Sequence, residues 1–380
     1  MQLRDFDPDE FLAEHWQKKP VLLRGALAPF ADPLEPEELA GLALESDVES
    51  RLVIGGDERL SVEHGPIAPE RFDRLGTSDW TLLVQGVDTL VPQVAALIEP
   101  FRFIPDWRID DVMVSFAAKG GGVGAHFDAY DVFLVQGEGR RRWRIGGPCD
   151  DATPLRPHDD LRLLAAFEPV AEYELEPGDI LYIPPGIAHE GVALSERCMT
   201  YSIGFRAPSQ SELLADFLDH LLETTGDDPR YADPDLARQD NPGEIARSAL
   251  DRLHATVLER VQDPDAFARW FGEFASTPKR GAPEDAYDGA MLLAAAQQGA
   301  PVIRAPASRF AFIREGKDTL TLFADSRAHR CTGLAAEFAE HICAVGIEPV
   351  DTTLATDEVA IALLQTLLQH GALVIEESEA

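Results

Sequence analysis

A glycine-rich stretch that runs directly into a His-x-Asp motif constrains this chain more than any other feature. It reads Gly-Gly-Gly-Val-Gly-Ala-His-Phe-Asp-Ala-Tyr and spans residues 120–130. We expect a strand here, and side chains at positions i and i+2 of a strand point to the same face. His126 and Asp128 would then lie side by side, with Tyr130 following them. An imidazole beside a carboxylate forms part of a metal site, so the fold must supply the remaining ligand.

The third ligand is predicted in a second β-type segment, residues 177–189. There a Pro-Gly turn precedes a short apolar strand, a Pro-Pro-Gly turn and His189. Two histidines and one carboxylate on one side of a metal ion leave positions open for a cosubstrate and O2, as in the non-haem Fe(II) oxygenases. A lone histidine near a strand is more often structural, and it is the two motifs together that favour metal binding. We therefore predict that His126, Asp128 and His189 hold Fe(II).

The segment after the first motif predicts a buried arginine. Its pattern indicates a β-hairpin with strands over residues 131–136 and 140–145. Arg141, Trp143 and Ile145 alternate on one face, and the two apolar residues should direct that face inward. An unpaired guanidinium inside a barrel costs on the order of several kcal/mol, so it needs an anion. A dicarboxylic cosubstrate such as 2-oxoglutarate would supply one through a bidentate pair, and a structural salt bridge is the alternative.

Two more strands place polar side chains where a ligand could meet them. Asp111 and Met113 share one face of a strand over residues 111–116. Inside a cavity, the carboxylate would pair with a cationic side chain and the thioether would pack on its flat face; the alternative is a surface edge strand. In the expected final core strand, Thr200 and Ser202 share a face. Either hydroxyl could donate a hydrogen bond to the cosubstrate or have only a structural role.

The charge balance indicates the class of partner. Asp and Glu number 67 against 33 Lys and Arg, a net charge of −34. This charge repels phosphate backbones, so we expect no direct nucleic-acid binding. It attracts basic partners such as ribosomal proteins, although acidity can also serve solubility alone. The expected absence of a membrane span, of a signal peptide and of Cys-x-x-Cys spacing favours a cytoplasmic protein.

The order of patterns predicts three parts. Residues 1–206 read as an oxygenase domain whose barrel core begins at about residue 80. Residues 207–280 carry apolar stripes at helical spacing, which either coat the barrel or form a dimer interface. After a linker over residues 277–283, residues 281–380 combine helices with a hairpin, as winged-helix domains do. No helix of this last part is basic, so a structural or protein-docking role is favoured over nucleic-acid binding.

Several segments together resemble the bacterial JmjC/cupin-type ribosomal oxygenases. These segments are residues 11–27, 38–53, 105–116, 120–146, 175–191 and 201–208. The resemblance implies a mixed α+β fold: a double-stranded β-helix (jelly-roll, cupin) barrel with flanking helices, then a helical dimerisation module and a winged-helix-like C-terminal domain. It also implies dependence on Fe(II), 2-oxoglutarate and O2, and Arg141 matches the position of the family's cosubstrate-binding arginine.

The resemblance extends to substrate and assembly. It implies hydroxylation at Cβ of an arginine in large-subunit ribosomal protein sixteen by a homodimeric enzyme. Asp111, Met113 and Tyr130 would line the arginine pocket, and Ser202 would lie beside the cosubstrate. Three alternatives stay open: the same chemistry on a histidine of another ribosomal protein, a non-catalytic cupin and winged-helix binding protein, and a small-molecule metal cupin. The last more usually carries His-x-His plus Glu, whereas this chain has Asp128.

Overall fold

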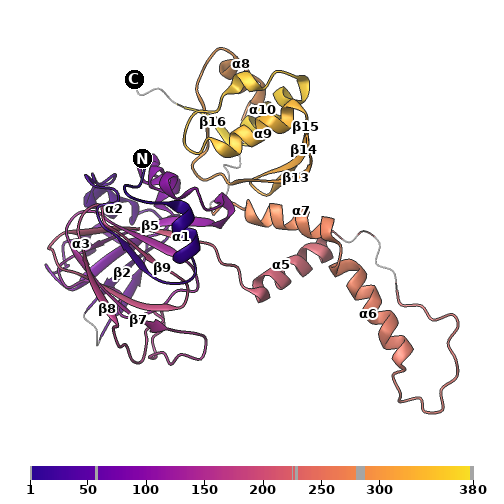
Figure 1. The fold of residues 1–380 in the computed structure, drawn as a ribbon, viewed down its shortest axis with the longest axis horizontal. Helices are drawn as coiled ribbons and strands as arrows, with labels where there is room; N and C mark the ends of the chain where they lie inside the picture. The colour runs from indigo at the N-terminus through magenta and orange to yellow at the C-terminus, as the bar shows by residue number, and fades with distance from the viewer. Residues whose placement is uncertain (1, 56–58, 225, 227–229, 280–286, 377–380) are drawn as a thin grey trace.

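The computed structural model describes residues 2–55, 59–224, 226, 230–279 and 287–376. A β-rich domain comes first, three helices extend from it, and a compact C-terminal domain lies above them in Figure 1. No helix within the described ranges combines the length and the apolar character needed to cross a membrane.

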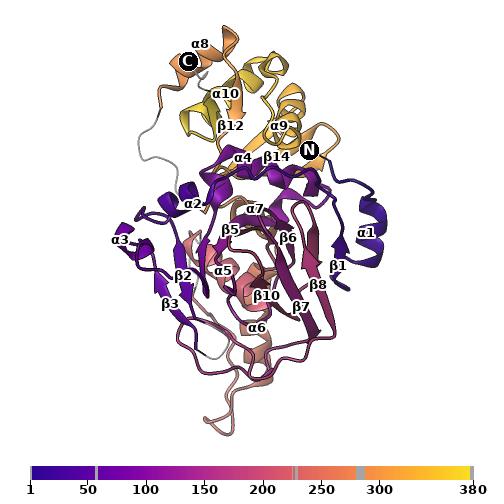
Figure 2. The same cartoon turned by 90° about the vertical axis from the view of Figure 1, so that its left-hand side faces the viewer.

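Two sheets build the first domain. The larger one contains β1 (Val21–Leu23), β2 (Ser50–Ile54), β3 (Ser61–His64), β4 (Trp80–Val84), β5 (Ile109–Ala117), β6 (Val132–Gln136), β9 (Ile180–Ile183) and β11 (Cys198–Phe205). Their spatial order is β1-β9-β6-β11-β5-β4-β2-β3. The smaller sheet, β10-β7-β8, contains β7 (Arg141–Pro148), β8 (Ala171–Leu175) and β10 (Ile187–Ala193). Figure 2 shows the smaller sheet in front of the larger one, which leaves an interior between two facing sheets, as in a jelly roll.

The predicted hairpin over residues 131–145 is wrong. β6 pairs with β9 and β11, whereas β7 pairs with β8 and β10. The short turn between them therefore carries the chain from one sheet to the other. Local alternation cannot distinguish a hairpin from such a crossing, because both join two strands of period two. The inward direction of Arg141 does hold, since it depends only on alternation within β7: Arg141, Trp143 and Ile145 are buried, and Arg142 and Arg144 are partly exposed.

Helices from the N-terminal residues cover the outer face of the larger sheet. They are α1 (Pro8–Glu14), α2 (Pro36–Leu42), α3 (Pro69–Phe72) and α4 (Pro92–Ala95). Asp7 caps α1 by accepting the N–H groups of Asp9 and Glu10, as N-cap carboxylates do. Phe11 of α1 and Tyr182 of β9 then form a T-shaped ring pair with a centroid distance of 4.9 Å. This apolar layer buries the outer face and leaves the inner face of the sheet for ligands.

Three helices link the barrel to the C-terminal domain: α5 (Gln210–Glu223), α6 (Arg247–Val261) and α7 (Pro264–Ala275). α5 and α7 meet through Phe217 and Trp270, whose rings lie 5.1 Å apart. α6 projects away from the body of the protein (Figure 1) and buries none of its side chains. Its apolar stripe, which includes Leu253 and Val257, is exposed. Of the two roles left open for these helices, coating the barrel is therefore wrong for α6.

The C-terminal domain has the elements of a winged helix. They are α8 (Gly289–Gln297), β12 (Val302–Arg304), β13 (Phe310–Gly316), β14 (Thr319–Ala324), β15 (Arg327–Thr332), α9 (Leu334–Ala344), α10 (Glu358–Gln369) and β16 (Leu373–Ile375). The predicted hairpin of β13 and β14 is confirmed, and β15 extends it to a third strand that the sequence analysis missed. The strand reads Arg-Ala-His-Arg-Cys-Thr and has no apolar run to signal it.

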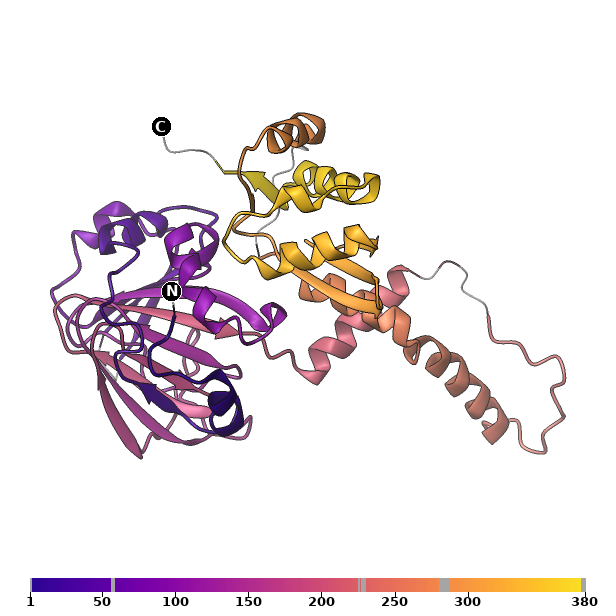
Figure 3. The same cartoon turned by 45° about the horizontal axis from the view of Figure 1, so that its top comes forward.

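Figure 3 shows the C-terminal domain beside the β-rich domain. Arginine side chains connect the two. Arg102 donates from Nη2 to Cys343 O at 2.7 Å, and Arg309 donates from Nη1 to Ile109 O at 2.7 Å. The first predicted domain boundary, after residue 206, falls between the end of β11 and the start of α5. The second, between residues 280 and 281, lies outside the described residues, as does most of the predicted linker.

Candidate metal centre and cofactor pocket

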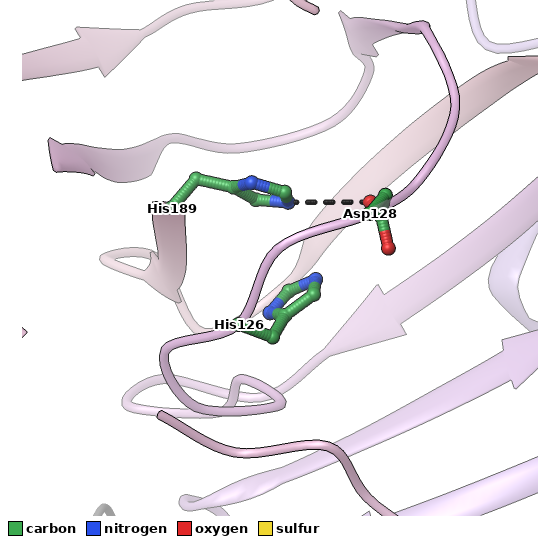
Figure 4. A group of neighbouring side chains, drawn as sticks. All are labelled: His126, Asp128 and His189. Carbon is green, nitrogen blue, oxygen red and sulfur yellow. Dashed lines mark ion pairs between the residues drawn. The ribbon is translucent and has the colours of Figure 1, made fainter. Parts of the chain in front are cut away.

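Three side chains converge at one end of the barrel interior. One ligand atom from each of His126, Asp128 and His189 lies within 4.8 Å of the others. Figure 4 shows both imidazoles and the carboxylate facing a common space, with His189 Nε2 at 3.5 Å from Asp128 Oδ2. Two imidazoles and a carboxylate on one side of a cation form the facial arrangement expected from the sequence.

The backbone around the first two ligands differs from the predicted strand. His126 forms an isolated antiparallel bridge with His189, in which each backbone N–H donates to the other residue's carbonyl at 3.0 and 2.8 Å. Asp128 lies outside any strand, and its carbonyl accepts the N–H of Gly186 at 2.7 Å. Cross-chain pairing therefore fixes both ligand segments, and no regular strand is needed to bring the side chains together.

Glycines make this close pairing possible. A Cβ on Gly122 would lie 2.4 Å from the carbonyl oxygen of Gly191 in β10, too close for any other residue. Gly124 has φ of +79°, a conformation that L side chains rarely adopt. It turns its carbonyl toward His126 Nδ1, at 2.9 Å. The glycine-rich stretch is thus a steric requirement of the metal-ligand loop.

Each histidine is oriented by a backbone carbonyl. Nδ1 of His126 contacts Gly124 O, and Nδ1 of His189 contacts Ile187 O at 2.9 Å. Because a carbonyl oxygen only accepts, Nδ1 must carry the proton in both rings. The lone pair of Nε2 then points into the common space, which is the usual second-shell arrangement around metal-binding histidines.

The protonation states also suit a cation. Burial and the neighbouring His189 lower the pKa of His126. Burial alone would raise the pKa of Asp128, but the contact with His189 and the charges of both imidazoles outweigh it and bring the pKa to about 2. At neutral pH the site therefore offers a carboxylate and neutral imidazole, the forms that bind metal. A divalent cation between these atoms would satisfy all three acceptors, so the residues fit Fe(II).

A cavity of about 510 Å³ opens beside the three ligands. Its walls are alternate residues of facing strands, as the period of two requires. They include Arg51 and Val53; Thr81, Leu83 and Gln85; Asp111, Met113 and Ser115; Val132 and Leu134; Arg141 and Trp143; and Thr200, Ser202 and Gly204. The cavity joins the metal ligands to residues that the sequence analysis singled out on three other strands.

Arg141 is a buried cation in this cavity that lacks a complete set of partners. Its residue exposure is 4 %. Nε and Nη2 have no hydrogen-bond partner among the described residues, and the guanidinium lies 5.8 Å from the centroid of Trp143. The alternative of a structural salt bridge is not seen in the described ranges. Because a buried unpaired charge is costly, the arrangement fits an anionic ligand such as 2-oxoglutarate.

Sequence reasoning missed three other polar groups of the cavity. Thr81 Oγ1, Gln85 Oε1 and Trp143 Nε1 are buried and also without a hydrogen-bond partner in the described part of the chain. Thr81 shares a face of β4 with Leu83, and Gln85 continues the alternation directly after the strand, so alternation could have found both once the sheet order was known. Trp143 was placed inward correctly, but only as an apolar group, and its indole N–H is a spare donor near Arg141.

The predicted substrate residues line the same cavity. Asp111 is 4 % exposed, and Met113 is partly buried. Burial raises the pKa of Asp111, while Lys279 acts in the opposite direction. Tyr130 is half exposed and lines both this cavity and an adjoining one. Thr200 and Ser202 are buried in its wall. All the predicted site residues therefore share one cavity.

Comparison with known proteins agrees with this geometry. The JmjC domain family matches residues 96–213, and the ROXA-like winged helix matches residues 259–374. The Escherichia coli ribosomal protein uL16 3-hydroxylase is 46 % identical over 299 residues, covering 78 % of this chain and 79 % of that protein.

Solved structures extend the match to nearly the full length. A crystal structure of Escherichia coli YcfD superposes with a TM-score of 0.87 at 39 % identity, covering 99 % of this chain and 100 % of that chain. The ribosomal oxygenase YcfD in complex with cobalt and 2-oxoglutarate gives a TM-score of 0.84 at 38 % identity, covering 99 % of both chains.

These relationships confirm the predicted fold class, enzyme class and cofactors Fe(II), 2-oxoglutarate and O2. The barrel with its winged helix, the cavity beside a His-Asp-His cluster and the identity to the Escherichia coli enzyme all lead to one conclusion. The chain belongs to the JmjC-domain family of 2-oxoglutarate-dependent ribosomal oxygenases.

Proposed function

We propose that this protein hydroxylates Cβ of an arginine side chain in ribosomal protein uL16. The observation that carries the proposal is a pair of opposite buried charges in one cavity. Arg141, a buried guanidinium with unsatisfied donors, and buried Asp111 line the cavity together with the metal ligands. The cation suits a dicarboxylate, and the anion suits a cationic side chain. The cavity therefore offers a cosubstrate site and a site for arginine beside the metal ligands.

The proposed roles follow from these positions. His126, Asp128 and His189 would hold Fe(II), which with 2-oxoglutarate and O2 supplies the oxidation of a C–H bond and yields succinate and CO2. Arg141 would pair with the distal carboxylate of 2-oxoglutarate, with Ser202 beside it. Asp111 would accept the substrate guanidinium, and Met113 and Tyr130 would pack against it. The enclosing sheets would exclude water from the reacting centre.

The proposed partner agrees with the charge of the chain. A net charge of −34 favours a basic protein such as uL16 and disfavours direct contact with nucleic acid. We also propose a cytoplasmic location, because the proposed substrate is a ribosomal protein. We further propose a homodimer formed through α5, α6 and α7, because exposed apolar side chains such as Leu218 of α5 and Val257 of α6 remain without cover in one chain.

Succinate release and product mass test this function together. Purified protein would be incubated with Fe(II), 2-oxoglutarate and uL16 from the same organism, beside Asp128→Ala and the exposed-loop control Asp151→Ala. We expect succinate formation stimulated by uL16, with the mass of one oxygen atom gained on a single arginine. Asp128→Ala should lose both signals and also Co(II) binding, whereas Asp151→Ala should keep them. If a histidine of another ribosomal protein gains the oxygen atom, that protein is the substrate in place of uL16. If no ribosomal protein is turned over, the proposed function is refuted.

A further inference from the structure

One lysine from outside the barrel contacts two carboxylates that line the active-site cavity. Lys279 follows α7, far along the chain from the barrel strands. Its Nζ lies 2.8 Å from Asp110 Oδ2 and 3.1 Å from Asp111 Oδ2. Asp111 Oδ2 also accepts the N–H of Gly86 at 2.9 Å. The carboxylate proposed to bind the substrate cation therefore already has a cationic partner from the same chain.

The chain holds this lysine in place from two sides. Arg206, which follows the last barrel strand, donates to Ala275 O at 3.2 Å and to Thr277 O at 3.3 Å. Thr277 Oγ1 lies 2.9 Å from Ser326 Oγ in the C-terminal domain. The segment before Lys279 is thus fixed between the barrel and the C-terminal domain, and the lysine side chain extends from a positioned backbone.

Lys279 stands where two cavities meet. Asp110, Ala129 and Tyr130 line both the metal-site cavity and a second cavity of about 770 Å³. Lys279 lines the second cavity and contacts carboxylates that line the first. A peptide whose side chain enters the first cavity would lie along this junction. Its cation would meet the ammonium group of Lys279 before it could contact Asp111 fully.

We propose that Lys279 is a specificity-determining residue whose ammonium competes with the substrate guanidinium for Asp110 and Asp111. This inference rests on the proposed function, since it assumes that Asp111 binds a substrate cation. In the free enzyme the ammonium compensates a carboxylate that is 4 % exposed. A guanidinium displaces it because its planar fork binds carboxylates through two parallel hydrogen bonds, which a single ammonium cannot do. The lysine side chain is 31 % exposed, so the displaced group can turn to water.

The competition excludes weaker ligands. A neutral or poorly matched side chain cannot replace the ammonium, because displacement would leave buried Asp111 without the cation that contacts it. Asp110 would keep Arg206, whose Nε lies 3.4 Å from its Oδ1. Arginine meets that requirement. An ion pair that only fixed the chain after α7 would have a different consequence: its removal would change stability and leave substrate affinity as it was.

Three variants test the proposal with the full chain. Lys279→Met removes the competing charge, Lys279→Arg replaces it with a stronger competitor, and Lys317→Met removes a lysine from the exposed turn between β13 and β14. The KM and kcat for uL16 would be measured with Fe(II) and saturating 2-oxoglutarate. Equilibrium binding of uL16 would be measured without O2, so that affinity is read without turnover.

We expect Lys279→Met to lower both KM and the dissociation constant about two- to fivefold, the range of a partly exposed ion pair, with kcat unchanged. Lys279→Arg should raise both constants, and Lys317→Met should change neither. With uL16 whose target arginine is replaced by glutamine, the difference between wild type and Lys279→Met should disappear. An unchanged or lowered affinity in Lys279→Met would overturn the proposal. If wild-type protein neither binds nor hydroxylates uL16, the proposed function itself has failed, which is a separate result.

Discussion

Replacing Arg141 by methionine should weaken 2-oxoglutarate binding while leaving the ligand-free protein at least as stable. The guanidinium is 4 % exposed, and two of its nitrogens lack a hydrogen-bond partner among the described residues. Removing such a charge relieves a desolvation cost, so the free energy of unfolding without ligand should stay constant or rise. Methionine keeps the length and apolar volume of the stem beside Trp143.

The loss of affinity follows from the same two nitrogens. Two charge-assisted hydrogen bonds to a carboxylate, measured by truncating one partner, correspond to about 2–4 kcal/mol. At 1.4 kcal/mol per factor of ten, the dissociation constant of 2-oxoglutarate should rise roughly 30- to 1,000-fold. No such change is expected for Arg140→Met, because Arg140 is exposed and pairs with Glu174 on the outside of the barrel.

Thermal unfolding with and without ligand measures both effects. A ligand at 100 times its dissociation constant stabilises the folded state by about 2.7 kcal/mol. With Co(II) in place of iron, wild type and Arg140→Met should gain stability as 2-oxoglutarate is added, and Arg141→Met should gain almost none at the same concentrations. The reasoning is refuted if Arg141→Met is destabilised without ligand and still responds to 2-oxoglutarate like wild type. That result would identify a structural arginine.

Three further changes have defined outcomes. Asp111→Asn should raise the KM for uL16 about ten- to hundredfold, because the substrate guanidinium loses a charged acceptor, with 2-oxoglutarate affinity unchanged. Burial raises the pKa of Asp88 to about 6 from 3.8, so the folded protein holds this proton more tightly and stability falls as pH rises from about 4 through 6. Asp88→Asn should remove that loss, on the order of 1–3 kcal/mol above pH 6 in denaturant unfolding. Leu253→Glu with Val257→Glu should convert the proposed dimer to monomer in sedimentation.

Each of these has an outcome that contradicts it. An unchanged KM in Asp111→Asn would indicate that the substrate cation binds elsewhere in the cavity. An advantage of Asp88→Asn that is equal at pH 4 and pH 7 would show that the side chain acts through packing, since the amide still accepts the N–H of Val112. A dimer that survives both glutamates on α6, or that is lost equally in the exposed control Glu259→Gln, would argue against the α6 stripe as the interface.

The local sequence predicted correctly those features that depend only on neighbouring residues. Alternation placed Arg141 and Trp143 inward because the side-chain period of a strand does not depend on its neighbours. The same argument failed for the strand expected at His126 and Asp128, where an isolated bridge to His189 fixes the chain. The two residues do belong to the metal-ligand cluster, but the strand predicted around them is wrong. Their pairing partner lies about sixty positions away in the chain and leaves no local signal.

The sequence by itself determined which chemistry the chain can perform: the metal-ligand residues, the inward arginine, the acidic surface and the order of the three parts. Only the tertiary structure decided which strands pair, that the turn after β6 crosses between sheets, and that α6 stands free of the barrel. It alone brought Lys279 to Asp110 across 169 positions. Periodicity and turn chemistry act over a few residues, whereas the contact of two distant charges depends on how whole domains dock, which no local pattern records.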